Sequence, residues 1–275
     1  MKSVKPHIKA IASDLDGTLL PYHGQFNTAD IETLTRLGQS GVVRIIATGR
    51  SLWSAQKVIS PDFPIDYLVF SSGAGILNWK TQQLIENYCI PFEDVHRTTT
   101  LFKRHNLAFT LHHRSPDNHR FYYHQGSSPH PNLAAYLEHY HPNGQPLMEP
   151  VPHDAYSQLL AFMPNWEQFD TISRQVTNMK TIRATSPIDD ASIWLECFHP
   201  QVSKAHGVNL ICKHHQISEH DVAAIGNDYN DMDLLSTFRH SAVVANAPQE
   251  LRNMFHSVRP VNEAGFTDFM SQFTS

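Results

Sequence analysis

The chain has 275 residues, of which 41% are hydrophobic and 17% charged, and its formal net charge at pH 7 is −5. This length is sufficient for two compact domains. The acidic balance argues against sequence-independent binding to nucleic acid, which requires a basic surface. No apolar stretch is long enough to cross a bilayer, and the segment 1–10 is not followed by the apolar core of a signal peptide. We therefore expect a cytoplasmic globular protein that binds neither nucleic acid nor membrane.

Strand and helix patterns alternate in the first part of the chain. Short apolar runs are typical of buried strands, and the segments between them carry apolar residues at helical spacing. In chain order they are Ile8–Ser13 (strand), Thr28–Leu37 (helix), Val42–Ile46 (strand), Ser51–Val58 (helix) and Tyr67–Phe70 (strand). Alternation of this kind predicts a parallel sheet.

The pattern changes after Gly73. Two apolar segments, Ile76–Trp79 and Leu84–Ile90, predict a hairpin, and from Pro91 the chain becomes richer in His, Tyr and Pro. We expect helices at Phe92–Arg104 and Trp166–Val176, and strands at Ala108–His112, Arg120–His124, Tyr156–Phe162, Thr181–Ala184 and Ile193–Phe198. Runs of antiparallel strands with helices predict an α+β module inserted into the first domain.

The alternating pattern returns after His199. The expected elements are a helix at Ala205–His214, a strand at Val222–Ile225, a helix at Met232–Phe238 and a strand at Ala242–Val244. The sequence therefore predicts an α/β protein with two domains. The first is a discontinuous, Rossmann-like parallel-sheet core of residues 1–90 and 191–275, and the second is an inserted α+β domain of residues 91–190.

A short acidic motif, Asp-Leu-Asp-Gly-Thr, follows the first predicted strand directly. In an open parallel sheet, ligands bind beyond the carboxyl ends of the strands. Residues two apart in an extended segment point to the same side, so Asp14 and Asp16 can face one small volume. Gly17 allows main-chain N–H groups to approach an anion. Taken alone, the motif is equally compatible with a turn that only caps the strand.

Two further segments are placed where they can reach the same edge of the sheet. Thr48, Gly49 and Arg50 come after the strand Val42–Ile46, and a hydroxyl at that point can donate to a phosphoryl oxygen. Lys204 lies in the first turn of a predicted helix, where the helix dipole favours an anion over a cation. A phosphate bound there would explain both the lysine and the helix N-terminus. Taken alone, each of these segments is also compatible with ordinary residues on the protein surface.

The loop after the strand Val222–Ile225 is rich in oxygen donors. Asn227, Asp228, Asn230 and Asp231 suit a hard cation, although they also fit a helix N-terminus with an acidic first turn. One pair of like charges at about 4 Å costs about 4 kcal/mol at an effective dielectric constant of about 20. Four carboxylates and a phosphate therefore need compensating charge. Together, the four segments predict a site for a metal ion and a phosphate, with Lys204 as a second positive charge.

In their order, spacing and placement, the four segments resemble the four motifs of the haloacid dehalogenase superfamily of phosphohydrolases. The insert resembles the large α+β cap, type IIB, of the Cof-like branch. The resemblance covers nearly the whole chain and implies a Mg²⁺-dependent phosphatase that acts on a small phosphorylated metabolite, expected to be a sugar phosphate. Two alternatives stay open: a sugar phosphomutase or other phosphotransferase, and a catalytically idle ligand-binding relative. The oligomeric state is not predicted.

The resemblance also implies a role for each matching residue. Asp14 is expected to attack phosphorus and become an aspartyl phosphate, and Asp16 to act as general acid and base. Thr48 and Lys204 are expected to hold the transferring phosphoryl oxygens. The implied substrate-binding residues are Gly17, Gly49, Arg50 and Asn230, and the implied Mg²⁺ ligands are Asp14, the carbonyl of Asp16, Asn227, Asp228 and Asp231.

Two positions depart from the family pattern. Members usually have Asp where this chain has Asn227, and we expect Asp228 to restore the missing charge. Ser72 stands where Asn usually precedes Gly73. Apart from these, His112, His113, His119 and His124 gather on a predicted hairpin without a standard zinc-ligand spacing. We expect them on the surface of the insert, with one or two contacting substrate.

Overall fold

The computed structural model describes residues 7–127, 130–185 and 192–273. They form two compact units, one of residues 1–49, 59–86 and 203–275 and the other of residues 50–58 and 87–202, as far as these are described. Both units combine helices with a sheet, which confirms the predicted α/β class. The predicted domain boundary at residues 190 and 191 lies outside the described residues. No described helix has the length and apolarity needed to span a membrane.

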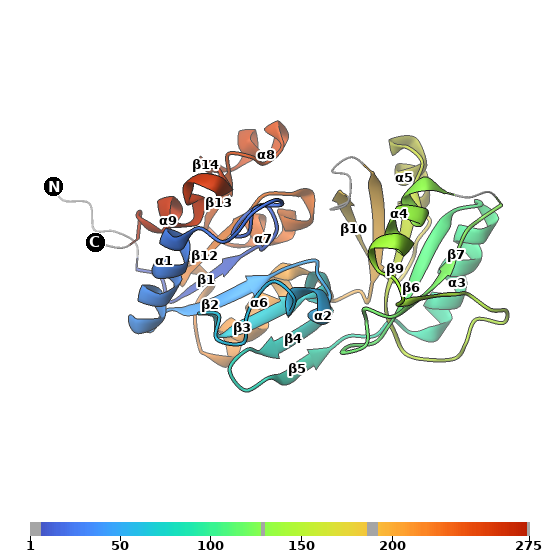
Figure 1. The fold of residues 1–275 in the computed structure, drawn as a ribbon, viewed down its shortest axis with the longest axis horizontal. Helices are drawn as coiled ribbons and strands as arrows, with labels where there is room; N and C mark the ends of the chain where they lie inside the picture. The colour runs from blue at the N-terminus through green and yellow to red at the C-terminus, as the bar shows by residue number, and fades with distance from the viewer. Residues whose placement is uncertain (1–6, 128–129, 186–191, 274–275) are drawn as a thin grey trace. The chain divides into compact units, whose positions relative to one another are not determined.

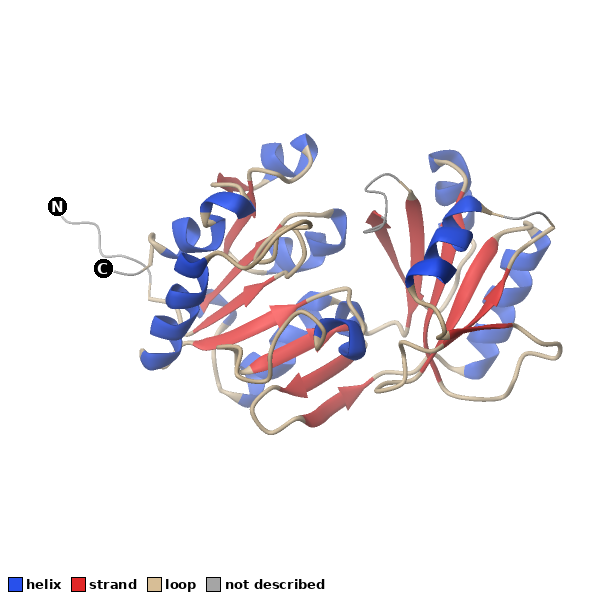
Figure 2. Ribbon diagram, viewed as in Figure 1, coloured by secondary structure: helices blue, strands red, loops and turns tan. Residues whose placement is uncertain are grey.

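The first unit contains a sheet that has eight strands within the described residues (Figure 2). Neighbouring strands run parallel from one edge as far as β3, and β4 is antiparallel to β3. Ser13, at the end of β1, pairs with Ile46 on one side and Ile225 on the other, so these three strands end at the same level. The strand order is β14 (His256–Val258), β13 (His240–Val244), β12 (Val222–Gly226), β1 (Ala10–Ser13), β2 (Val43–Ala47), β3 (Tyr67–Phe70), β4 (Gly75–Asn78) and β5 (Gln83–Asn87).

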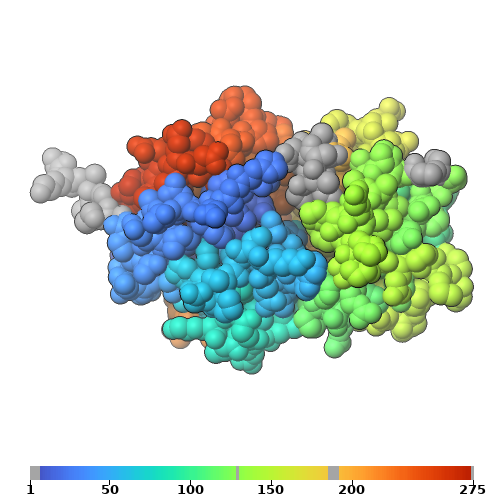
Figure 3. All heavy atoms as spheres, in the orientation of Figure 1, coloured from blue at the N-terminus to red at the C-terminus, as the bar shows by residue number. Residues whose placement is uncertain are grey.

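Helices of the first unit pack in pairs. In the first pair α1 (Thr28–Gln39) contacts α9 (Gly265–Met270), so a helix from the first part of the chain and one from its last part lie side by side, as Figures 1 and 3 show. The second pair, α6 (Lys204–His214) and α7 (Met232–Thr237), packs apolar side chains against the alternating Ala, Ile and Val residues of one sheet face. A further helix, α8 (Gln249–Met254), contacts β13 and β14.

The second unit contains a sheet with six strands among the described residues, and helices pack on both of its faces. The helices α3 (Phe92–Arg104) and α5 (Trp166–Ser173) contribute to one apolar cluster, and α4 (Pro131–His139) to another. The strand order is β10 (Lys180–Thr185), β11 (Ile193–Phe198), β9 (Tyr156–Met163), β6 (Ala108–His113), β7 (Phe121–His124) and β8 (Gly144–Pro146). Every residue of the central strand β9 is buried, because its side chains alternate between the two clusters.

The structure departs from the predicted elements in several places. The helix expected at Ser51–Val58 is only α2 (Leu52–Ala55), and this segment groups with the second unit. The helix expected to reach Val176 ends at Ser173. The sequence analysis missed α4, α8, α9, β8 and β14, which are short or lie in stretches with weak periodicity. The strand β11 pairs with β9 and β10, so the chain leaves the second sheet only after residue 198.

One of the four clustered histidines is buried, contrary to the expectation that they line the surface. His112 lies on β6 and is only 4% exposed. Its Nδ1 is 2.9 Å from the carbonyl oxygen of Asn118, which accepts only, so Nδ1 carries the hydrogen. Its Nε2 then accepts from the Thr110 hydroxyl at 2.9 Å. Because burial disfavours the charged ring, the pKa of His112 is lowered from 6.5 to about 4. This histidine has a structural role.

The buried ring predicts a specific acid sensitivity. Since the folded state binds the His112 proton less tightly than the unfolded chain does, the stability contributed by the neutral ring is complete above about pH 6.5. It is lost as the pH falls toward about 4, by about 1.4 kcal/mol per pH unit. His112→Gln should therefore give a shallower fall in unfolding free energy over this range, measured by urea denaturation. His96→Gln, on the exposed side of α3, is the control, and parallel curves for His112→Gln and wild type would contradict the assignment.

Candidate active site

Polar side chains follow three adjacent strands at the carboxyl edge of the first sheet. Asp14 follows β1, Thr48 follows β2 and Asn227 follows β12, and all three are at most 5% exposed. Parallel strands direct the chain to the same edge each time, so residues more than 200 positions apart in the sequence become neighbours. The first of the predicted segments thus meets the last.

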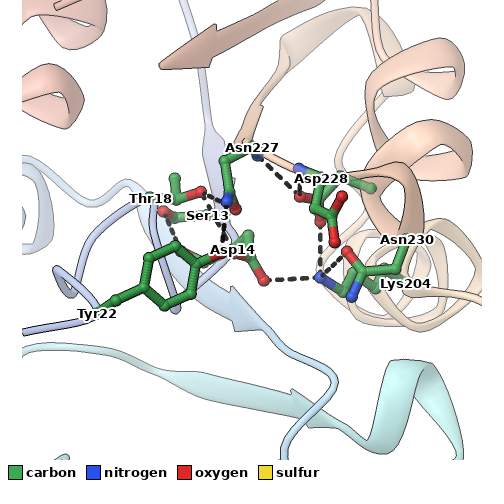
Figure 4. Close-up of polar contacts among 9 residues, drawn as sticks. Ser13, Asp14, Thr18, Tyr22, Lys204, Asn227, Asp228 and Asn230 are labelled. Carbon is green, nitrogen blue, oxygen red and sulfur yellow. Dashed lines mark hydrogen bonds and ion pairs between the residues drawn. The ribbon is translucent and has the colours of Figure 1, made fainter. Parts of the chain in front are cut away.

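Lys204 lies at the centre of this group and is 1% exposed. It is the first residue of α6, whose N-cap Ser203 accepts a hydrogen bond from the main-chain N–H of His206 at 3.1 Å. The ammonium donates to Asp14 Oδ1 and to Asp231 Oδ1, both at 2.6 Å, and reaches Asn230 Oδ1 at 3.4 Å (Figure 4). Its three hydrogens are therefore directed at three oxygens, and the lysine joins α6 to the loops after β1 and β12.

Asp231, expected to be a Mg²⁺ ligand, is fully buried, and its carboxylate is bound by protein donors. One carboxylate oxygen accepts from Lys204, and the other accepts from the main-chain N–H groups of Asn227 and Asp228 at 2.9 and 3.1 Å. Both oxygens are thus occupied by protein donors. This geometry does not favour the predicted role of Asp231 as a metal ligand. The Asp231 carboxylate instead fixes the main chain of the loop after β12 and holds Lys204. Asp228, half-buried, enters this network through its main-chain N–H.

The side chain of Asn227 lies directly over the Asp14–Asp16 segment. The terminal atom of its carboxamide that faces inward is 3.0 Å from Asp14 Oδ2, 2.9 Å from the carbonyl oxygen of Asp16 and 2.9 Å from Thr18 Oγ1. The outer terminal atom is 3.0 Å from the Tyr22 hydroxyl. Gly17 passes beneath with φ of 75°, and a Cβ at this position would lie 2.5 Å from the Asn227 amide. Only glycine fits here.

The charges around Asp14 oppose one another. Burial and the charge of Asp231 disfavour the Asp14 carboxylate more than Lys204 favours it, and together they raise the pKa of Asp14 to about 8. Burial alone would lower the pKa of Lys204, but the charges of Asp14 and Asp231 outweigh it and raise that pKa above its usual range. The ammonium therefore stays charged. One lysine does not fully compensate the carboxylates that surround it.

The remaining predicted residues are less closely joined to Asp14. Thr48 is buried, and its main-chain carbonyl accepts from the N–H of Ser72 at 2.9 Å. A Cβ placed on Gly49 would lie 3.5 Å from the amide nitrogen of Asn230, so the segment after β2 lies beside the loop after β12. Arg50 belongs to the second unit, where its guanidinium donates to Ser54.

Ser71 and Ser72 adopt a conformation that residues with a side chain rarely take. Their φ angles are 47° and 55°, in the left-handed region. Ser72 is fully buried, and its hydroxyl has no hydrogen-bond partner among the described residues. Strain and an unpartnered polar atom together are typical of a functional segment. The sequence analysis noted Ser72 only as a departure from the family pattern, and its position before Gly73 was the available signal.

Thr18 and Tyr22 were also missed as contributors to the site. The Thr18 hydroxyl lies between Asp14 Oδ2, at 3.3 Å, and Asn227, at 2.9 Å, and is completely buried. Thr18 was visible as part of the acidic motif, and its hydroxyl could have been assigned to its neighbours. Nothing in the sequence marks Tyr22, because its contact with Asn227 joins positions 205 residues apart.

Oxygen donors converge beside Asp14, although the described residues contain no group of three His, Cys, Asp or Glu side chains arranged to hold a metal. The donors are one carboxylate oxygen of Asp14, the main-chain carbonyl of Asp16 and the carboxamide of Asn227. One carboxylate oxygen and two carbonyl oxygens suit Mg²⁺, which prefers oxygen ligands and needs few direct carboxylates. The residues present therefore fit a magnesium ion at this point.

Comparison with known proteins identifies the family. Residues 11–270 match the haloacid dehalogenase-like hydrolases. The chain belongs to this family. In Bacillus subtilis (strain 168), the phosphatase-family protein YxeH is 24% identical over 263 residues, covering 94% of this chain and 95% of YxeH. The 5-amino-6-(5-phospho-D-ribitylamino)uracil phosphatase YwtE of the same organism is 21% identical, covering 98% of this chain and 99% of YwtE.

Solved structures show the same fold. A haloalkanoate-superfamily phosphatase from Bacteroides thetaiotaomicron superposes with a TM-score of 0.83 at 20% identity, covering 99% of each chain. A subclass IIB sugar phosphatase of the superfamily superposes with a TM-score of 0.77 at 19% identity, covering 96% of this chain and 98% of its own. The predicted membership of the family, in the branch with the type IIB α+β cap, is confirmed.

The position of Asp231 depends on Gly226. A Cβ on Gly226 would lie 2.6 Å from the Asp231 carboxyl group. Gly226→Ala should displace that carboxylate from Lys204 and lower the free energy of unfolding by about 1–3 kcal/mol, the usual effect of overpacking. Thermal unfolding followed by circular dichroism measures the change. Gly24→Ala is the control, because its Cβ would meet only Pro21, at 3.4 Å, on an exposed loop. Equal melting temperatures for the two variants would contradict the packing argument.

Proposed function

We propose that this protein is a Mg²⁺-dependent phosphatase that hydrolyses a small phosphorylated metabolite through an aspartyl-phosphate intermediate. The observation that carries the proposal is the buried arrangement of Asp14, Lys204 and Asp231 at the carboxyl edge of the parallel sheet. A lysine at a helix N-terminus, beside a carboxylate held at a strand end, forms a site for an anion that is attacked by that carboxylate. Membership of a hydrolase family that includes phosphatases supports the same reaction.

The proposed Mg²⁺ ligands are Asp14, the carbonyl of Asp16 and the side-chain carbonyl of Asn227. When bound, the ion would neutralise charge on the transferring phosphoryl oxygens. We no longer include Asp231 among the ligands, because both of its oxygens accept from protein donors. A role for the Asp228 carboxylate at the metal stays a prediction from the sequence.

Within this proposal, Asp14 Oδ1 attacks phosphorus, since Oδ2 is turned toward Asn227 and Lys204 holds Oδ1. A bond forms between Oδ1 and phosphorus as the ester P–O bond breaks, and Asp16 gives its proton to the leaving oxygen. Asp16 then takes a proton from water, whose oxygen attacks the phosphorus of the intermediate. Cleavage of the P–O bond to Asp14 releases inorganic phosphate and restores the carboxylate.

The other predicted residues bind the phosphoryl group or the substrate. Lys204 exchanges its long contact with Asn230 Oδ1, at 3.4 Å, for a phosphoryl oxygen, to which Thr48 and the amide of Asn230 also donate. Main-chain N–H groups around Gly17 and Gly49 can approach the anion closely. Arg50 is proposed as a substrate-binding residue on the family resemblance alone. A sugar phosphate is the proposed substrate, because one structural neighbour is a sugar phosphatase and YwtE is named for a substrate with a phosphorylated ribityl chain.

The test is phosphate release from p-nitrophenyl phosphate and a panel of sugar phosphates in the presence of Mg²⁺. Asp14→Asn should lower the turnover by about three orders of magnitude or more, because an amide cannot serve as the nucleophile. The melting temperature should stay near that of the wild type, since the amide has nearly the same shape. Asp62→Asn, at an exposed position of the first unit, is the control for loss of one charge. Substantial single-turnover phosphate release by Asp14→Asn would rule out the aspartyl-phosphate mechanism.

A further inference from the structure

The carboxamide of Asn227 can take two orientations, which differ by a half-turn about its last bond and place its two terminal atoms at the same positions. In the first, the nitrogen faces inward. Its two hydrogens are then directed at Asp14 Oδ2, the carbonyl of Asp16 and Thr18 Oγ1, at 2.9–3.0 Å, and the outward oxygen accepts from the Tyr22 hydroxyl at 3.0 Å. Every atom of the amide has a partner, and no cation is needed. Hydrogen bonding alone therefore favours the inward nitrogen.

In the second orientation, the oxygen faces inward. It accepts from the Thr18 hydroxyl at 2.9 Å, and the outward nitrogen donates to the Tyr22 hydroxyl at 3.0 Å. The same oxygen now lies 3.0 Å from Asp14 Oδ2 and 2.9 Å from the carbonyl of Asp16, so that three acceptors face one another. Such an arrangement is unfavourable unless a cation lies among them.

The two distances from the inward Asn227 atom fit a hydrogen bond and also a pair of neighbouring Mg²⁺ ligands. Oxygens about 2.0–2.1 Å from Mg²⁺ at neighbouring octahedral positions lie about 2.9 Å apart, because the angle between them is a right angle. The two distances from Asn227, 3.0 and 2.9 Å, agree with this value. One set of atomic positions therefore serves two states, a closed hydrogen-bonded cluster and the ligand face of a cation.

The two hydroxyl groups make both states accessible. Thr18 and Tyr22 each carry a hydroxyl, which donates or accepts as its neighbour requires. When the amide turns, each hydroxyl reverses its role and keeps its partner. An aspartate at position 227 has no equivalent first state, because both of its oxygens are acceptors and one would face Asp14 and the Asp16 carbonyl directly.

We propose that Asn227 is a cation-responsive amide, with its nitrogen inward when the site holds no Mg²⁺ and its oxygen inward when Mg²⁺ is bound. This inference rests on the proposed function for the location of the ion. Binding of Mg²⁺ must replace the hydrogen bonds of the inward nitrogen, and Asn227 adds no charge in return. The wild-type protein therefore has a stable metal-free site and a weaker affinity for Mg²⁺ than an aspartate would give.

The first experiment compares wild type with Asn227→Asp by thermal unfolding and by isothermal titration with Mg²⁺ alone. In EDTA, Asn227→Asp should melt several degrees lower, because like charges then face each other in a buried site. Saturating Mg²⁺ should restore its melting temperature, and its affinity for Mg²⁺ should exceed that of the wild type by about tenfold or more, as expected for one added ligand charge. Asn253→Asp, on the exposed side of α8, is the matched control. Equal melting temperatures in EDTA and equal affinities would overturn the proposal.

The second experiment follows the amide itself in the wild-type protein, so it does not depend on the variant folding. The side-chain N–H resonances of Asn227 are identified by NMR through their absence from a spectrum of Asn227→Asp or Asn227→Ser. Titration with Mg²⁺ should move them, because the hydrogens leave Asp14 and the Asp16 carbonyl for the Tyr22 hydroxyl. Resonances that do not move while calorimetry shows Mg²⁺ bound would overturn the rotation.

The failure of this inference is distinguishable from that of the proposed function. If phosphate release depends on Mg²⁺ but the Asn227 amide resonances do not respond to Mg²⁺, the proposed phosphatase function is supported and the proposed rotation of the amide is wrong. If the Asn227 amide resonances respond to Mg²⁺ but the protein releases phosphate from none of the tested esters, the rotation of the amide is supported and the proposed phosphatase function is wrong.

Discussion

The site depends on one buried ammonium group. Lys204 is withdrawn from water and held by two carboxylates at 2.6 Å, one from the loop after β1 and one from the loop after β12. Withdrawing a charge from water costs several kcal/mol, so this arrangement persists only because both partners are close and well aligned. Asp231 in turn fixes the main chain of its own loop. A single ion triad thus holds two strand ends and a helix N-terminus in register.

The same triad leaves an excess of negative potential beside Asp14. Burial and Asp231 act against the carboxylate, and one lysine does not compensate for them. An amide at position 227 in place of an aspartate reduces this excess by one charge, and with its nitrogen inward it also donates to Asp14 Oδ2 and the carbonyl of Asp16. The neutral residue therefore relieves a strain that the rest of the constellation creates. Local charge balance, more than any single contact, explains why an amide is tolerated here.

Much of the fold was predictable because its signals are local. Apolar runs of four to six residues alternating with helical spacing identified β1, β2, β3 and β12, and the helical spacing also placed the start of α1 at Thr28, where Asn27 is the N-cap. The helix α4 was missed because Leu133 and Tyr136 become buried only after packing against the second sheet. The strand β8 was missed because its three residues, Gly144–Pro146, carry no apolar run and are mostly exposed. His112 shows the same limit. Its polar side chain suggested the surface, but β6 turns its ring into the interior, next to Tyr136.

For the site, the sequence alone set which residues are available: acidic and amide side chains at strand ends, which a parallel sheet brings to one edge, and a lysine at the start of a helix. The tertiary structure decided which contacts each of these residues makes. Only the fold shows that Asp231 faces Lys204 and two main-chain N–H groups, and that Tyr22 reaches Asn227 across 205 residues of sequence. The reason is physical. A motif specifies donors and acceptors, but which of them meet depends on distances and directions that the packed chain alone sets.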